Sequence, residues 1–237
     1  MEAIVKFIQT GGFFMYPILF VLAFGIAISI ERYIKLTRVR NQNRSMWNKL
    51  YPVMAKGDFD SAREMTQKDK STISQLLNAG LELQGTVRRR DDIEIVMEET
   101  MMEIIPQLEK RTPYVALFSN ISTLLGLLGT IMGLIQAFTA VANANPADKA
   151  DLLSGSIAVA MNTTALGLIA GIPLLIVYVI LTSKTGEIVD SLEMASVKTL
   201  SVITKMAKRQ FAAATSPAPE PGPGGPAPAA APAAPAE

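Results

Sequence analysis

Residues 119–137 read SNISTLLGLLGTIMGLIQA, an apolar stretch in which small and hydroxyl-bearing side chains recur at every third or fourth position. In an α-helix, this spacing places them on one face. The stretch lies within an uncharged run, residues 114–147, which is longer than the roughly 20 residues that cross a bilayer. The sequence therefore predicts a transmembrane helix with a stripe of small and polar groups, whose members are Ser119, Ser122, Thr123, Gly126, Gly129, Thr130, Gly133 and Ala137.

A second uncharged run, residues 152–183, repeats the pattern and predicts another transmembrane helix. Its stripe consists of Ser156, Ala160, Thr163, Thr164, Gly167, Ala170 and Gly171. Gly129 with Gly133, and Gly167 with Gly171, are small-xxx-small pairs that allow helix backbones to approach closely. We therefore expect a helix-packing face, to which Gly126 and Pro173 also belong. Pro173 lacks a backbone N–H and predicts a bend in the helix.

These stripes are typical either of a packing surface or of a lined pathway. Asn162, Thr163 and Thr164 follow one another at membrane depth, where polar groups are costly unless paired or hydrated. With Thr130, they are the candidate residues of an ion pathway. Neither run contains Asp, Glu, Lys or Arg, although proton relays in membranes use ionisable groups. A conducted proton would therefore need a carboxylate from a partner subunit.

The composition of the whole chain also indicates a membrane protein, since 49% of its 237 residues are hydrophobic. A third apolar segment lies between Lys6 and Glu31 and is followed by five basic residues, namely Arg32, Lys35, Arg38, Arg40 and Arg44. The positive-inside rule then places the N-terminus outside the cytoplasm, and residues 32–112 and the C-terminus in the cytoplasm.

We predict an all-α integral membrane protein with three transmembrane helices and long cytoplasmic helical extensions. The expected segments are an amphipathic N-terminal segment (1–12), transmembrane helix 1 (13–36), a cytoplasmic helical domain (37–113), transmembrane helix 2 (114–143), a periplasmic loop (144–151), transmembrane helix 3 (152–183), a cytoplasmic C-terminal helix (184–212) and a disordered Pro/Ala-rich tail (213–237). Within the cytoplasmic domain, residues 56–60 predict a turn in which Asp58 caps the next helix. Transmembrane helix 2 is expected to continue as a helix below Tyr114.

Composition excludes several kinds of chemistry. The chain has no Cys and no His, which excludes thiol catalysis, disulfides and His-based metal sites. With no intramembrane Asp either, an intramembrane hydrolase lacks its catalytic groups. We expect no enzyme activity, no catalytic residue, no metal, no cofactor and no nucleic-acid partner; the surroundings that matter are the lipid bilayer and other subunits.

Residues 124–135 (LLGLLGTIMGLI) and 160–173 (AMNTTALGLIAGIP) resemble the MotA/TolQ/ExbB proton channel family. Three spans, with the large segment between the first and second, are similar to its ExbB/TolQ side, since MotA-type stators have four. The resemblance implies a homopentamer in the bacterial inner membrane. Its second and third helices would line a pore around the single-span helices of ExbD/TolR-like subunits, whose Asp carries the proton. A TonB/TolA-like energy transducer is a further implied partner.

The resemblance also maps the family's pore threonines onto Thr130 and Thr164. Family members commonly carry a Glu five positions before the second threonine, where this chain has Val159. This departure leaves proton and sodium as alternative driving ions, because uncharged oxygen ligands suit a hard cation. We therefore expect the pore-forming subunit of an ion-driven motor that energises envelope or outer-membrane transport. The alternative is a non-conducting oligomeric membrane scaffold.

Overall fold

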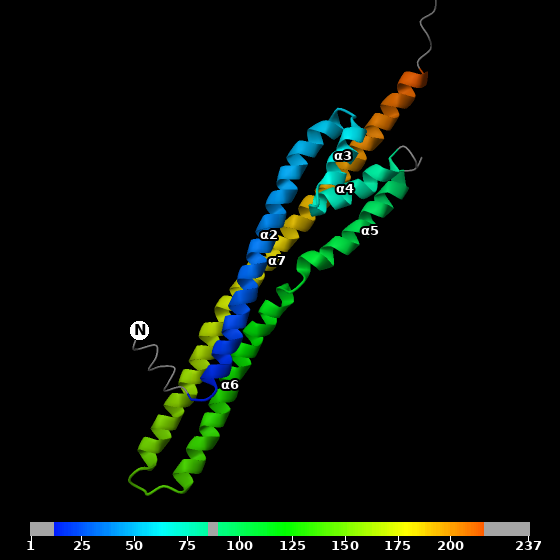
Figure 1. Ribbon diagram of the computed structural model, residues 1–237. Helices are drawn as coiled ribbons and strands as arrows, with labels where there is room; N and C mark the ends of the chain where they lie inside the picture. Colours follow the sequence, from blue (N-terminus) through cyan, green and yellow to red (C-terminus); the bar gives the residue numbers. More distant parts are fainter. Residues whose placement is uncertain (1–11, 85–89, 216–237) are drawn as a thin grey trace, which may run out of the picture.

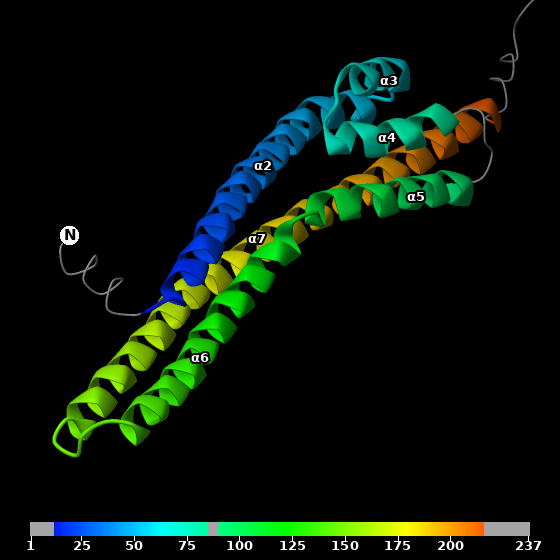
Figure 2. The ribbon, with the colours of Figure 1, turned by 60° about the horizontal axis from the view of Figure 1, so that its bottom comes forward.

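The computed structural model describes residues 12–84 and 90–215, and these residues form helices and no β-strand. The helices are α2 (Met15–Ala55), α3 (Phe59–Lys68), α4 (Thr72–Leu83), α5 (Arg90–Glu109), α6 (Thr112–Ala142) and α7 (Lys149–Thr215). They form a rod in which α6 and α7 make a long hairpin and α2 lies along it (Figures 1 and 2). Three helical stretches, in α2, α6 and α7, are long and apolar enough to cross a membrane. The predicted all-α class with three membrane-length helices is confirmed.

The three long helices differ from the expected segments mainly in continuity. α2 extends through the first span to Ala55, and α7 runs without interruption from Lys149 to Thr215. α7 continues as one helix through Pro173, which is an interior residue. Close packing holds α7 there, because Leu174 lies so near Gly25 of α2 that a Cβ on Gly25 would be 2.7 Å from its Cδ1.

The chain breaks where a continuous helix was expected below Tyr114. α5 ends at Glu109 and α6 begins at Thr112. Between them, Arg111 has a φ of 68°, the left-handed conformation, which a non-glycine residue rarely adopts because its Cβ approaches the following carbonyl. This residue redirects the chain so that α5 leaves the line of α6 (Figure 2).

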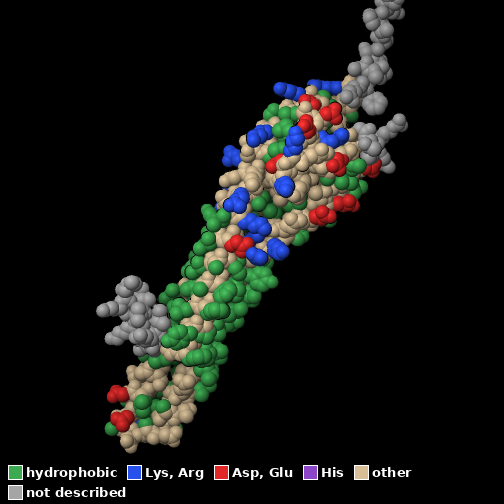
Figure 3. Space-filling model, viewed as in Figure 1, with side chains coloured by type: hydrophobic (Ala, Val, Ile, Leu, Met, Phe, Trp, Pro, Cys, Tyr) green, Lys and Arg blue, Asp and Glu red, His purple; other side chains and the backbone are tan. Residues whose placement is uncertain are grey.

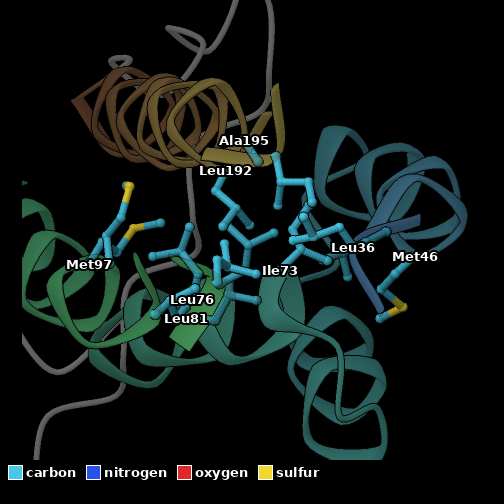
Figure 4. Packing of buried hydrophobic residues seen from close by; sticks show 14 of the residues in the cluster. Leu36, Met46, Ile73, Leu76, Leu81, Met97, Leu192 and Ala195 are labelled. Carbon is cyan, nitrogen blue, oxygen red and sulfur yellow. The ribbon is translucent and has the colours of Figure 1, made fainter. Parts of the chain in front are cut away.

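The end of the rod opposite the α6–α7 loop is a charged bundle, by which we mean α3, α4, α5 and the parts of α2 and α7 packed on them (36–55 and 181–209). Lys, Arg, Asp and Glu crowd its surface, whereas the visible face of the middle of the rod is mostly hydrophobic (Figure 3). Its core places α4 side chains between α2, α5 and α7 (Figure 4), including Ile73, Leu76 and Leu81 against Leu36, Met97 and Leu192.

Local capping sets the short helices of the charged bundle. Asp58 accepts a hydrogen bond from the Ser61 backbone N–H at 3.1 Å and caps α3, as predicted. Gly57, with φ of 87°, makes the turn before it. Ser71 caps α4 by accepting from the Ser74 N–H. Such caps satisfy N–H groups that the first helical turn leaves free.

Polar contacts tie α2 to α7 at the border between apolar rod and charged bundle. Lys184 Nζ donates to Thr37 Oγ1 at 2.8 Å and lies 3.5 Å from the centre of the Tyr33 ring. One turn further on, Arg40 pairs with Glu187 at 3.1 Å. The predictions for residues 1–11 and for the tail from 216 onwards fall outside the described residues.

Candidate functional site

The two glycine stripes face each other and bring α6 and α7 into backbone contact. A Cβ on Gly167 would lie 2.8 Å from the Ser122 carbonyl oxygen and 2.9 Å from the Gly126 Cα. A Cβ on Gly129 would lie 2.3 Å from Thr163 Cγ2. Real Cβ atoms essentially never come within 3.0 Å of such a neighbour, so an alanine would force a shift at both positions. At Gly167 the neighbours are backbone atoms, which makes glycine the residue that fits.

The contact continues along both helices. A Cβ on Gly133 would lie 2.8 Å from the Ala160 Cβ, and one on Gly171 would lie 2.5 Å from Thr123 Oγ1. The glycine stripes of α6 and α7 thus pack these two helices of the same chain against each other. Pro173 lies outside this contact: it is exposed and borders an apolar groove between α7 and α2.

Hydroxyl groups cross-link the two helices beside the glycines. Thr164 Oγ1 donates to the Gly126 carbonyl at 2.9 Å, and Ser119 Oγ donates to the Gly171 carbonyl at 2.6 Å. Thr130 Oγ1 instead donates to the Leu127 carbonyl of its own helix at 2.6 Å. Each hydroxyl therefore satisfies its donor while its lone pairs can still accept a hydrogen bond or bind a cation.

Thr130 and Thr164 lie on the side of the hairpin that faces away from α2. Leu166 of α7 is buried in one cluster with the α2 residues Met15 and Ile18, and Leu125 of α6 packs against this cluster. At 100° per residue, Thr130 is about 140° around α6 from Leu125, and Thr164 is about 160° around α7 from Leu166. The structure thus brings the two threonines to one edge of the α6–α7 contact.

Thr123 belongs to the same edge, although the sequence prediction assigned it only to the stripe. It is two turns from Thr130 on α6 and its Oγ1 lies against Gly171. We call Thr123, Thr130 and Thr164 the hydroxyl seam. The hydroxyl seam faces away from α2. The side that it faces therefore depends on where α2 packs, and the periodicity of a single helix does not reveal this.

The other two candidate pathway residues lie elsewhere on α7. Thr163 is 2% exposed, fills the space beside Gly129, and donates from Oγ1 to the Val159 carbonyl at 3.0 Å. Asn162 is half-buried and lies about 160° around the helix from Thr164. The structure therefore groups Thr164 with Thr130, places Thr163 inside the helix contact, and does not bring Asn162 to the seam.

A buried basic residue, unassigned by sequence reasoning, supports the base of this hairpin. Arg32 of α2 is 1% exposed and donates from Nη2 to the Leu108 carbonyl near the end of α5. Its neighbour Glu31 forms a two-pronged ion pair with Arg111, at 2.8 and 2.9 Å. The two contacts fix the left-handed residue between α5 and α6. In the sequence, Arg32 looks like the other basic residues that follow the first span. Its role depends on the contact with α5, which lies far along the chain.

Comparison with known proteins is consistent with this architecture. Residues 68–194 match the model of the MotA/TolQ/ExbB proton channel family. A putative biopolymer transport protein ExbB homolog of Methanothermobacter thermautotrophicus is 25% identical over 194 residues, covering 81% of this chain and 67% of the relative.

Two further relatives match over shorter stretches. The Tol-Pal system protein TolQ of Haemophilus influenzae is 34% identical over 96 residues, covering 40% of this chain and 39% of TolQ. The biopolymer transport protein ExbB of Salmonella typhimurium is 30% identical over 129 residues, covering 50% of this chain and 51% of its own length. The chain thus spans about half or less of these two relatives.

The family match covers more than half of the chain, including α6 and the part of α7 that forms the glycine contact. The relatives carry the names ExbB and TolQ, and the chain has three membrane-length helices. This chain therefore belongs to the MotA/TolQ/ExbB proton channel family and is of the ExbB/TolQ type.

Proposed function

We propose that this protein is the pore-forming subunit of an ion-driven motor that energises biopolymer transport across the cell envelope. The observation that carries the proposal is the hydroxyl seam: Thr123, Thr130 and Thr164 gather on one edge of a helix pair that is free of charged residues from 114 to 142 and from 152 to 183. Hydroxyl oxygens can pass a hydrated proton or bind a small cation without a fixed charge.

The seam needs a partner to conduct protons. An intramembrane carboxylate is the usual proton carrier, and these two stretches hold none. We assign that carboxylate to an Asp on a single-span ExbD/TolR-like subunit, enclosed by a ring of α6–α7 hairpins in a homopentamer. A TonB/TolA-like protein would receive the work. In this arrangement, the N-terminus is periplasmic and the charged bundle is cytoplasmic in an inner membrane.

Transport assays on the seam test the proposal. The chain, co-purified with its single-span partner, is reconstituted in liposomes, and ion flux is followed under a proton or a sodium gradient. Thr164→Val and Thr130→Val keep side-chain shape but remove the hydroxyl. We expect flux to fall about tenfold or more, the effect of roughly 1.4 kcal/mol on the barrier, and Thr→Ser at the same positions to retain most of it.

Thr139→Val is the matched control. Thr139 is exposed on α6 and makes the same kind of intrahelical bond, from Oγ1 to the Ile135 carbonyl at 2.8 Å. It lies about 180° around α6 from Thr130, so its loss should leave flux unchanged. Wild-type flux in both seam variants would overturn the proposal.

The glycine contact gives the scaffold alternative a specific basis, because it packs α6 on α7 with no ion required. A pure scaffold predicts that the assembled complex passes neither protons nor sodium ions. The same liposome assay on the wild-type complex separates the two functions.

A further inference from the structure

Two helices on opposite flanks of the charged bundle carry opposite charge. Residues 32–56 of α2 hold seven basic residues and no acidic one, whereas α5 holds seven acidic residues and one basic residue, Arg90. α4 and α7 lie between these helices (Figure 4), and Lys and Arg gather at the α2 edge of the visible face while Asp and Glu gather at its α5 edge (Figure 3). Among the described residues, no ion pair joins α2 to α5.

The acidic side has a groove of about 340 Å³ between α5 and α7. Three carboxylates line it, from Glu94, Glu98 and Glu193, and its lining contains no Lys or Arg. Two apolar lining residues are largely exposed, namely Met102 (71%) and Val197 (63%). Exposed apolar groups rimmed by polar ones are typical of an interaction surface. We call these five residues the acidic flank.

A second groove, of about 580 Å³, lies on the other side of α7, between α7 and α2. Its lining holds both signs of charge, from Arg40, Arg44, Glu187 and Asp190. Arg40 and Glu187 neutralise each other in a pair 3.1 Å apart, whereas Arg44 and Asp190 form no ion pair among the described residues. Since residues 32–56 are basic throughout, the surroundings of this groove are positive.

Aromatic rings and a lysine border the same groove. Trp47 lines it, and the centre of its ring system is 5.2 Å from that of Tyr51. Lys198 of α7 is exposed, and its Nζ lies 6.0 Å from the centre of the Tyr51 ring. Arg, Trp and Tyr are the side chains that contribute most to protein interfaces. We call Arg44, Trp47, Tyr51 and Lys198 the basic flank.

A membrane surface does not account for the basic flank. Arg44 is 13 residues beyond Glu31, about 20 Å of helix, and Lys198 is 15 residues beyond Ser183, about 22 Å of helix. Charges in solution are screened over about 8 Å at physiological ionic strength. Headgroups at the ends of the apolar segments are therefore too far away, and an acidic protein surface is the better match.

A second copy of this chain supplies such a surface. The two flanks are opposite in charge and lie on either side of α7. A contact between two different faces of one subunit is heterologous, and it closes into a ring when the rotation between copies allows. A symmetric contact of either flank with itself would bring like charges together, which is unfavourable.

We propose that the acidic flank of each copy docks on the basic flank of the next, with Glu94 and Glu98 facing Arg44 and Lys198. Met102 then meets the aromatic side of the groove. This inference deepens the proposed function and rests on it, because the contact would hold together the charged bundles of the homopentamer.

Charge reversal tests the contact in the full chain co-purified with its single-span partner. Glu94→Lys with Glu98→Lys, or Arg44→Glu with Lys198→Glu, brings like charges face to face. We expect either variant to dissociate at about tenfold higher concentration than wild type, or more, as measured by mass photometry in detergent. All four substitutions in one chain restore opposite charges, so this variant should assemble like wild type.

Glu99→Lys with Glu103→Lys is the matched control. Both residues are exposed on α5, and each lies five residues after Glu94 or Glu98, about 140° further around the helix. This variant has the same charge as the acidic-flank variant and should stay assembled. The contact is refuted if reversal of the flanks dissociates the complex no more than this control does, or if the fourfold variant fails to recover.

Cross-linking gives a result that a loss of stability cannot imitate. The chain has no cysteine, so Met102→Cys with Tyr51→Cys places one thiol on each flank. A flexible bismaleimide should then link the copies into a ladder of products larger than a dimer, whereas either cysteine alone should leave monomers on a denaturing gel. Products that stop at the dimer, or that need only one of the cysteines, would contradict a contact between unlike flanks.

The contact and the motor function can fail separately. If Thr130→Val and Thr164→Val retain full flux while reversal of a flank breaks the assembly, the motor function falls and the contact stands. If the reversals leave the assembly intact while the seam variants lose flux, the contact falls and the motor function stands.

Discussion

Of the described glycines, Gly167 is the one whose added Cβ would come nearest to the backbone of the other helix. A Cβ there would collide with the Ser122 carbonyl oxygen and the Gly126 Cα, and backbone cannot rotate away as a flexible side chain can. We expect Gly167→Ala to lower stability by about 1–3 kcal/mol, the usual cost of overpacking. The melting temperature of the purified protein in detergent measures the loss.

Gly155 provides the control on the same helix. Nothing lies within 4 Å of the position its Cβ would take. Gly155→Ala should therefore leave the melting temperature unchanged or raise it slightly, since alanine favours helix more than glycine does. Equal destabilisation by both substitutions would contradict the glycine contact.

A second prediction for a single residue concerns Arg32. Its guanidinium is buried and donates to the Leu108 carbonyl, while Nε has no partner among the described residues. Arg32→Leu removes the donor and leaves that carbonyl unpaired, at a cost of about 1–3 kcal/mol. Lys35→Leu, three residues later and exposed, should change the melting temperature much less. Unchanged melting of Arg32→Leu would mean that the α5 end is not held by this contact.

At the scale of the elements, side-chain hydrogen bonds hold the first turn of α4. Ser71 caps the helix, and Asp69 accepts hydrogen bonds from the hydroxyls of Ser71 and Ser74. We expect Ser71→Ala to lower the stability of the charged bundle by about 1 kcal/mol. Ser45→Ala, on the exposed side of α2, should have no such effect. Thermal unfolding followed by circular dichroism compares the two.

The same cluster gives α4 a pH dependence. Burial acts to raise the pKa of Asp69, but the hydrogen bonds from Ser71 and Ser74 outweigh it and hold that pKa below its ordinary value. The carboxylate therefore stabilises the fold above its unfolded pKa, near 4, and this contribution disappears as pH falls through the lower folded value. Melting between pH 6 and 3 should drop less steeply in Asp69→Asn than in wild type; parallel curves would contradict it.

Sequence reasoning succeeded for elements whose signals are local. The uncharged runs, the Asp58 cap and the three membrane-length helices all depend on neighbouring residues, and all are found. It failed at Arg111, where a helix was expected to continue. Pro113, in the first turn of α6, was a local signal that a helix starts there. The left-handed conformation of Arg111 could not be predicted, because the residue is held by Glu31, about 80 residues earlier.

In the candidate site too, features set by neighbouring residues could be predicted, and features set by distant residues could not. Thr130 and Thr164 could be named from the stripes and the family resemblance, but the side they face became visible only once α2 was packed on the hairpin. Asn162 shares the polar run with Thr164 yet lies on another side of α7.

For the whole molecule, the two ends of the rod should lie on opposite sides of a membrane. The chain has no cysteine, so Asp148→Cys, in the α6–α7 loop, and Lys49→Cys, in the charged bundle, can each be labelled without background. In intact cells, an impermeant maleimide should label the first and spare the second. In inverted vesicles the pattern should reverse. Labelling of both from one side would exclude the proposed topology.

The unequal construction of the two hairpin helices has a mechanical consequence. α7 is a single helix of 67 residues, about 100 Å long, whereas its partner in the hairpin, α6, begins only after the left-handed joint at Arg111, which separates it from α5. α7 thus joins the membrane end of the rod to the charged bundle as one unbroken helix, whereas the α5–α6 side reaches the bundle through a joint that Glu31 and Arg32 hold in place. A displacement of the membrane end would therefore reach the charged bundle directly through α7, and through α6 only by way of the contacts at Arg111.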